Sequence, residues 1–159
     1  MSRLEPGTTA PDFTLPAAGG GQVSLADLRR GSERGAVVYF YPRAATPGCT
    51  TEACDFRDNL ASLSGGGYSV VGLSTDPLED LESFAAAEQL TFPLASDRDH
   101  AVADAYGTWG PVTRNGVTRE VVHRSTFVVE PDGTLRLAQY DVDPDGHVAA
   151  LRADLGLDR

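Results

Sequence analysis

The two cysteines of this chain lie close together, and they are the residues best able to do chemistry. Cys49 follows an apolar stretch at 36–41 and stands near the start of an expected helix, and Cys54 comes five positions later. A thiol is a strong nucleophile only after losing its proton. The first turn of a helix favours a thiolate through its unpaired N–H groups and the positive end of the helix dipole. The stretch 37–54, VVYFYPRAATPGCTTEAC, therefore points to redox chemistry at sulfur.

Charged side chains elsewhere could strengthen or oppose that thiolate. The cations that could stabilise it are Arg43, Arg57 and Arg124. The carboxylates close in sequence that would oppose it are Glu52, Asp55 and Asp58. The sequence alone leaves this balance open.

Length and composition predict one globular domain over residues 1–159, without a cofactor or a metal. The net charge of −10 argues against nucleic acid and anionic membranes as partners. The start of the chain lacks the apolar core of a signal peptide, and no apolar run reaches the ~20 residues that span a bilayer. We therefore expect a cytoplasmic protein. Structural disulfides are rare in that compartment, so the two thiols are expected to be reactive or simply buried.

The apolar pattern predicts alternating strands and helices followed by a hairpin. Strands are expected at 22–23, 36–41, 68–74, 92–95, 117–122, 125–130 and 134–140. Helices are expected at 25–30, from 47 or 49 to 63, and at 77–89, 100–106 and 146–155, with an extended arm through Pro16. Alternation implies parallel strands with right-handed crossovers, and the hairpin adds antiparallel strands. The fold class is therefore α/β, with helices on both faces of a central mixed sheet.

Two helix starts carry clear signals. Thr46 is the expected N-cap of the cysteine helix, with Pro47 at its first position. Asp76 and Pro77 predict the same arrangement for the helix at 77–89.

The residues around Cys49 carry a resemblance to a known family. Pro42-x-x-x-Thr46-x-x-Cys49 matches the active-site motif of the peroxiredoxins, and FYPRAATPGCTTEACDFRD resembles the bacterioferritin comigratory protein, or peroxiredoxin Q, branch. Similar segments follow the expected order along nearly the whole chain: APDFTL, STDPLEDLESFA, FPLASDRDHAVADAYGTWG, RSTFVVEPDG and DGHVAAL. The resemblance implies a thioredoxin-like fold and a thiol peroxidase.

The resemblance also implies roles for single residues. Cys49 is similar to the peroxidatic cysteine, whose thiolate attacks a peroxide oxygen and becomes a sulfenic acid. Thr46 would position the peroxide, and the backbone N–H groups of Gly48 and Cys49 would hold its oxygens.

Three further residues complete the implied site. Pro42 would shield the pocket from water. Arg124 would contact thiolate and peroxide with its permanently charged fork, and Glu52 would orient that arginine.

By the same resemblance, Cys54 would resolve the sulfenic acid as an intramolecular disulfide, which makes the protein an atypical 2-Cys peroxidase. Thioredoxin is the expected reductant, with glutaredoxin or a low-molecular-weight thiol as alternatives, and the protein is expected to be a monomer or a dimer. On an intact helix, residues five apart have Cα atoms ~8.6 Å apart, whereas a disulfide needs at most about 7 Å. We therefore expect the helix to unwind around 49–55 on oxidation. The alternative is that Cys54 is only a buried apolar position.

Other kinds of function remain possible from the residues alone. A cysteine hydrolase would pair Cys49 with His100, His123 or His147. A thiol switch or redox sensor would share the first chemical step without turnover. A structural zinc site is disfavoured because two Cys and three His lack the paired ligand spacing.

Overall fold

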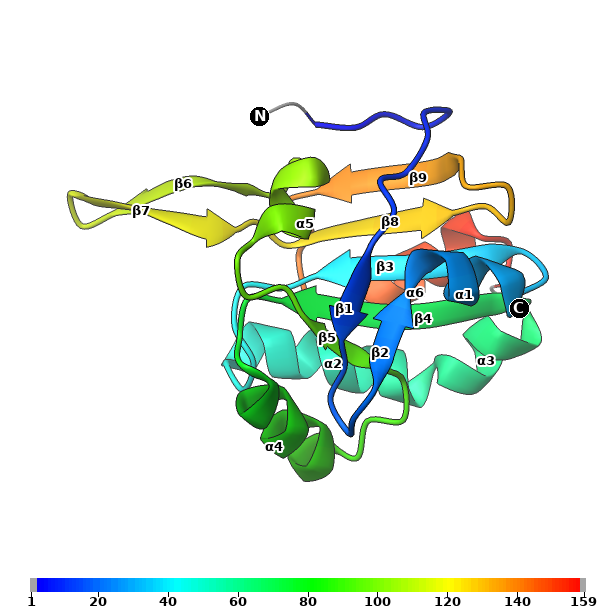
Figure 1. Cartoon of the computed structure of the whole chain (residues 1–159), viewed down its shortest axis with the longest axis horizontal. Coiled ribbons are helices and arrows are strands. Elements are labelled where there is room, and N and C mark those ends of the chain that lie inside the picture. Colours follow the sequence, from blue (N-terminus) through cyan, green and yellow to red (C-terminus); the bar gives the residue numbers. More distant parts are fainter. Residues whose placement is uncertain (1–2, 158–159) are drawn as a thin grey trace.

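The computed structural model describes residues 3–157 and contains a central five-stranded sheet (Figure 1). The strand order is β5-β4-β3-β8-β9. These strands are β3 (Gly35–Phe40), β4 (Tyr68–Ser74), β5 (Leu94–Ser96), β8 (Ser125–Val129) and β9 (Leu135–Tyr140). The sheet is mixed, because β3 pairs with β4 in parallel and with β8 antiparallel. The predicted fold class is therefore confirmed.

The central strand β3 is buried on both faces, as its unbroken apolar sequence predicts. Successive side chains point to opposite faces of the sheet. Val37 and Tyr39 join one apolar core, and Val38 and Phe40 join the other.

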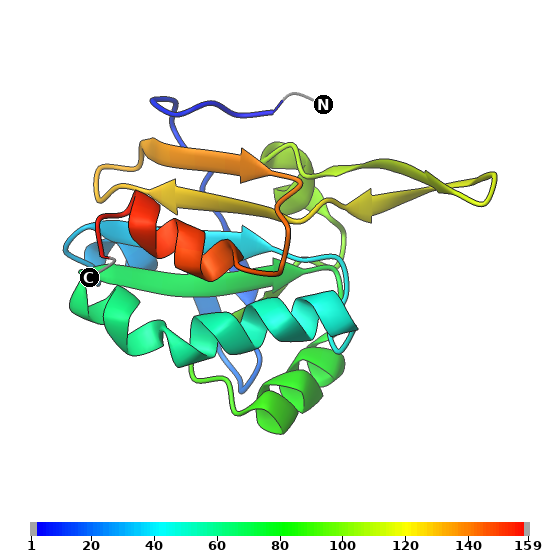
Figure 2. The same cartoon turned by 180° about the vertical axis from the view of Figure 1, so that it is seen from behind.

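Helices cover both faces. One core lies under α2 (Pro47–Asp58), α3 (Leu60–Gly65), α4 (Leu78–Glu88) and α6 (His147–Asp154), and Figure 2 shows α2, α3 and α6 across this face. The other core lies under α1 (Leu25–Arg30) and α5 (Ala101–Ala105), together with a short hairpin of β1 (Thr14–Pro16) and β2 (Gln22–Ser24). The predicted N-terminal arm runs beside the edge strand β9. Its Gly7 N–H donates to Leu135 O at 2.7 Å, which protects that edge.

A second hairpin projects from the sheet (Figures 1 and 2). It pairs β6 (Trp109–Arg114) with β7 (Val117–Val122). Its turn is Asn115-Gly116, where both residues have positive φ angles of 53° and 76°, as an Asn-Gly hairpin turn requires. The strand at 117–122 was expected, but β6 was not.

The structure corrects two helix predictions. The helix predicted to run to Leu63 ends at Asp58, and a separate helix, α3, begins at Leu60. At the junction the backbone N–H and the side chain of Asn59 both donate to Asp55 O, at 3.1 Å and 2.8 Å. The Asp76 cap is also wrong, since Pro77 itself stands at the N-cap position of α4. The Asp76 carboxylate instead accepts from Ala44 N at 2.7 Å and from Ser74 Oγ at 2.8 Å, which ties together the loops that follow β3 and β4.

Candidate active site

Cys49 lies in the first turn of α2, directly behind the loop that follows β3. Thr46 occupies the N-cap position and Pro47 begins the helix, as predicted. The Cys49 side chain is free and only 1% exposed. The thiol therefore sits near the positive end of the helix dipole, shielded from bulk water.

Arg124 joins Cys49 to Glu52. Its Nη2 lies 3.3 Å from Cys49 Sγ, and its Nη1 donates to Glu52 Oε1 at 2.7 Å. The Arg124 side chain is 13% exposed and that of Glu52 is 0% exposed. Burial opposes the charge on Arg124, but Glu52 and Cys49 outweigh it and raise the pKa of the guanidinium. Of the three candidate arginines, Arg124 is the one in hydrogen-bond contact with Cys49.

The buried carboxyl of Glu52 is poorly solvated. Burial raises its pKa to about 7, although the attraction of Arg124 acts in the opposite direction. Among the described residues its Oε2 has no hydrogen-bond partner. Protonation of Glu52 near neutral pH would weaken its ion pair with Arg124.

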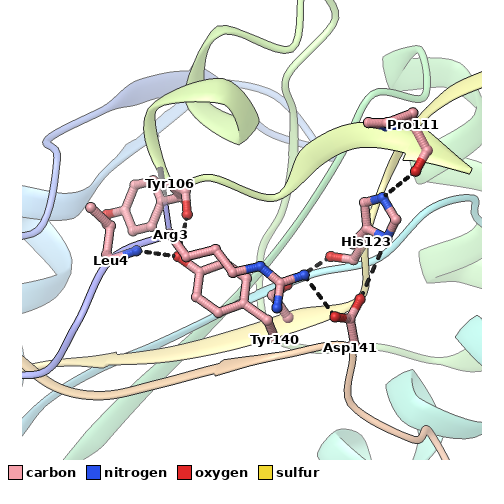
Figure 3. Close-up of polar contacts among 8 residues, drawn as sticks. Arg3, Leu4, Tyr106, Pro111, His123, Tyr140 and Asp141 are labelled. Atoms are coloured by element: carbon pink, nitrogen blue, oxygen red, sulfur yellow. Dashed lines mark hydrogen bonds and ion pairs between the residues drawn. The ribbon is translucent and has the colours of Figure 1, made fainter. Parts of the chain in front are cut away.

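The backbone that carries Arg124 is fixed from several sides, and Figure 3 shows the contacts of the neighbouring His123 and of Asp141. The neighbouring His123 directs Nε2 at Pro111 O, 3.2 Å away, and Nδ1 at Asp141 Oδ1, 3.4 Å away. Asp141 also accepts from Arg3 Nη2 at 2.7 Å. The Arg124 carbonyl accepts from Val142 N at 3.0 Å. The hairpin, the arm and the end of β9 thus hold this segment together.

Gly48 allows the arginine to approach α2 closely. A Cβ atom at this position would lie 3.1 Å from Arg124 Nη2 and 3.3 Å from Pro144 Cγ. Both distances are short for a Cβ contact, so a side chain here would displace its neighbours. The sequence did not indicate a role for Pro144.

Thr46 and Pro42 lie in the loop between β3 and α2. Thr46 holds the predicted N-cap position without a side-chain cap hydrogen bond, and its Oγ1 donates to Arg43 O at 2.8 Å instead. Ala45 has a φ of 65°, a left-handed conformation that is strained for a residue other than glycine. Pro42 is half-buried, two residues beyond β3.

Cys54 lies on the same helix with a different environment. Its thiol is half-buried and donates to Glu88 Oε1 at 3.3 Å. Burial raises its pKa, and the hydrogen bond to Glu88 raises it further. This contact was not predicted, because Glu88 stands at the end of α4, 34 positions from Cys54, and local sequence patterns do not predict how two helices pack.

The structure provides no support for a cysteine–histidine pair. His147 Nε2 lies 2.8 Å from Thr126 Oγ1, and His100 Nδ1 lies 2.8 Å from Asp104 Oδ2. His123 is engaged by Pro111 and Asp141. Within residues 3–157, no group of three or more His, Cys, Asp or Glu is arranged to hold a metal, and no helix has the length and apolarity to cross a bilayer.

A thiol at a helix start, held by a buried arginine–glutamate pair, agrees with the family that the sequence resembles. The AhpC/TSA family matches residues 6–138. This chain belongs to the AhpC/TSA family of peroxiredoxins. A Mycobacterium tuberculosis protein named as a peroxiredoxin is 53% identical to it over 156 residues, which cover 98% of each chain.

Two further comparisons agree on the branch. Peroxiredoxin Bcp of Escherichia coli is 42% identical over 147 residues, covering 92% of each chain. A solved structure of the bacterioferritin comigratory protein of Xanthomonas campestris, described for its alkyl peroxide reduction activity, superposes with a TM-score of 0.82 at 33% identity, covering 91% of this chain and 90% of that one. The predicted branch is thereby confirmed, and with it the thioredoxin-like fold of this peroxiredoxin.

Proposed function

We propose that this peroxiredoxin reduces hydrogen peroxide and organic hydroperoxides through a sulfenic acid at Cys49. The main observation in support is the 3.3 Å contact between Arg124 Nη2 and Cys49 Sγ at the start of α2. The Cys49 thiolate attacks one peroxide oxygen, the O–O bond breaks, and the other oxygen takes a proton and leaves as water or alcohol. Organic hydroperoxides are included because the Xanthomonas relative is described for alkyl peroxide reduction.

The neighbouring groups suit a peroxide in this position. Negative charge develops on sulfur and both oxygens, so donors that are already in place stabilise the transition state. Arg124 and the first-turn N–H groups of Gly48 and Cys49 supply donors. Thr46 Oγ1 already donates to Arg43 O, so it is left to accept a hydrogen bond from the peroxide O–H. Pro42 limits the access of water.

Cys54 then resolves the sulfenic acid as a disulfide, which cytoplasmic thioredoxin or another thiol reduces. The helix α2 runs unbroken from Pro47 to Asp58, so it must open for the two sulfurs to meet. The stretch from Gly48 to Thr51 has weak helix propensity, which lowers the free energy of opening.

The test is peroxide consumption with a thioredoxin system, comparing wild type with Cys49→Ser and Cys54→Ser. Cys49→Ser is expected to lose turnover with every donor. Cys54→Ser is expected to lose thioredoxin-linked turnover, and a small thiol should partly restore it. Full turnover by Cys49→Ser would overturn the proposal. Far-ultraviolet circular dichroism of the wild type should lose helical signal on oxidation, and an unchanged signal with a formed disulfide would contradict the opening of α2.

A further inference from the structure

The contact between Cys54 and Glu88 places a carboxylate on the second thiol of the proposed cycle. Glu88 Oε1 lies 3.3 Å from Cys54 Sγ, within the range for a hydrogen bond to sulfur. A carboxylate only accepts hydrogen bonds, so this geometry selects the protonated thiol as the donor. Two helices far apart in sequence, α2 and α4, are joined at this point.

Burial and then the hydrogen bond to Glu88 raise the pKa of the Cys54 thiol while α2 is folded. Besides Glu88, the charged groups that act on the thiol are Arg57, which favours the thiolate, and Asp58, which opposes it. Arg57 is partly occupied by other partners, because its Nε donates to Asp58 Oδ1 at 3.0 Å and its Nη1 donates to Glu88 O at 2.7 Å. A thiol in this setting needs help to lose its proton.

We propose that Glu88 is the general base of the resolving step, a role that rests on the proposed function of Cys54. Glu88 touches a reacting atom and needs no movement to reach the proton that must leave. It also lines an open groove of about 400 Å³ between α2 and α4, together with Thr50, Asp80 and Phe84. Solvent therefore reaches the carboxylate.

The step balances without a further reactant. Glu88 takes the proton of Cys54, and the Cys54 sulfur donates an electron pair to the sulfenic sulfur of Cys49. The S–S bond forms as the S–O bond breaks. The departing hydroxide takes the proton from Glu88 and leaves as water, so Cys54 is oxidised, the sulfenic sulfur is reduced and the carboxylate is regenerated.

The same contacts decide which half of α2 moves. Arg57 and Cys54 bind the C-terminal half of α2 to the end of α4, through the backbone and the side chain of Glu88 respectively. The N-terminal half is held at Cys49 by Arg124. Conversion of the thiolate to a neutral sulfenic acid weakens that hold. Cys49 therefore moves toward a Cys54 that stays beside its base.

The test is a single turnover of reduced protein with one equivalent of hydrogen peroxide, quenched with acid at intervals. Mass spectrometry follows the sulfenic acid, trapped with dimedone, and the disulfide separately, across pH 6–9. Glu88→Gln is expected to leave sulfenic acid formation within about twofold and to slow disulfide formation at pH 7 by roughly tenfold or more. The deficit should shrink as pH rises, because hydroxide can then remove the proton.

The sign of the effect separates a base from a mere neighbour. Removing a negative charge without removing a base would make Cys54 easier to ionise, so disulfide formation in Glu88→Gln that is as fast as wild type, or faster, overturns the proposal. A deficit that is the same at every pH also overturns it, since that indicates a structural role. Glu88→Asp keeps a carboxylate and should recover part of the rate. Glu79→Gln is the matched control, an exposed position in the first turn of α4.

A failure of the proposed function would look different. Wild-type protein that forms sulfenic acid but no disulfide removes the resolving role of Cys54, and the role of Glu88 with it. Wild-type protein that forms the disulfide, with Glu88→Gln indistinguishable from it, removes the role of Glu88 alone.

Discussion

The two cysteines of α2 have opposite electrostatic surroundings. Cys49 lies in the first turn, 1% exposed, with a guanidinium nitrogen 3.3 Å from its sulfur. Cys54 lies further along the helix, half-buried, with a carboxylate oxygen 3.3 Å from its sulfur. A cation favours the thiolate and a carboxylate favours the thiol. The two thiols of one helix thus have opposite electrostatic surroundings, as the proposed division of roles between them requires.

The largest effect is expected from the cation at Cys49. Arg124→Lys keeps a positive charge but loses the fork that joins Glu52 to Cys49, so the second-order rate constant of Cys49 with hydrogen peroxide should fall on the order of 100-fold. Stopped-flow measurement of sulfenic acid formation checks this. Arg43→Lys is the control, because Arg43 is exposed and adjoins the same loop. Rate constants that fall equally in the two variants would contradict a specific role for the contact between Arg124 and Cys49.

A pH effect on stability is expected from Glu52. Its pKa is 4.5 in the reference state and is raised to about 7 in the fold by burial. The protonated form is favoured in the fold, so the stability that it contributes is complete below pH 4.5 and is lost as pH rises to about 7. Glu52→Gln cannot ionise. The free energy of unfolding of wild type relative to this variant should therefore fall by about 3 kcal/mol between pH 4 and pH 8.

Urea titrations of both proteins at pH 4, 6 and 8 measure that difference. Asp97→Asn is a useful comparison, because burial also raises the pKa of this carboxyl but its partners are the backbone N–H groups of Val102 and Ala103, far from the thiols in sequence. A difference between wild type and Glu52→Gln that does not change with pH would mean that folding leaves the pKa of Glu52 unchanged.

The surroundings of Cys49 could largely be predicted from the sequence, whereas those of Cys54 could not. The apolar run before Cys49 and the residues Thr46-Pro47 mark a strand and a helix start by local rules, and the structure has both. Arg124, 75 positions from Cys49, was one of three candidate arginines, and only the resemblance to peroxiredoxins singled it out, since local sequence patterns do not predict a contact over such a separation. The contact of Cys54 with Glu88 depends on how α4 packs against α2.

Local misreadings had local causes. Pro111 concealed strand β6, because proline cannot donate to a strand ladder and argues against a strand. The Asn115-Gly116 turn was the available signal for that hairpin. Asp76 was assigned as a cap from its position before Pro77, but its carboxylate accepts from Ala44 N and Ser74 Oγ instead. The predicted helix to Leu63 ran through Asn59, where the structure has a break between α2 and α3.

The smallest effect is expected from the addition of one methyl group at Gly48. Gly48→Ala brings a Cβ atom to 3.1 Å from Arg124 Nη2, so the guanidinium must shift by a few tenths of an ångström. Sulfenic acid formation should slow roughly threefold to tenfold. Alanine favours the helix by up to about 1 kcal/mol, so the first turn of α2 should also open less readily and disulfide formation should slow.

Gly65→Ala is the matched control, since a Cβ atom at the end of α3 meets nothing within 4 Å. If Gly48→Ala slowed disulfide formation but left sulfenic acid formation at the wild-type rate, the close approach of Arg124 to α2 would not matter for the first step, and only the opening of the helix would depend on glycine.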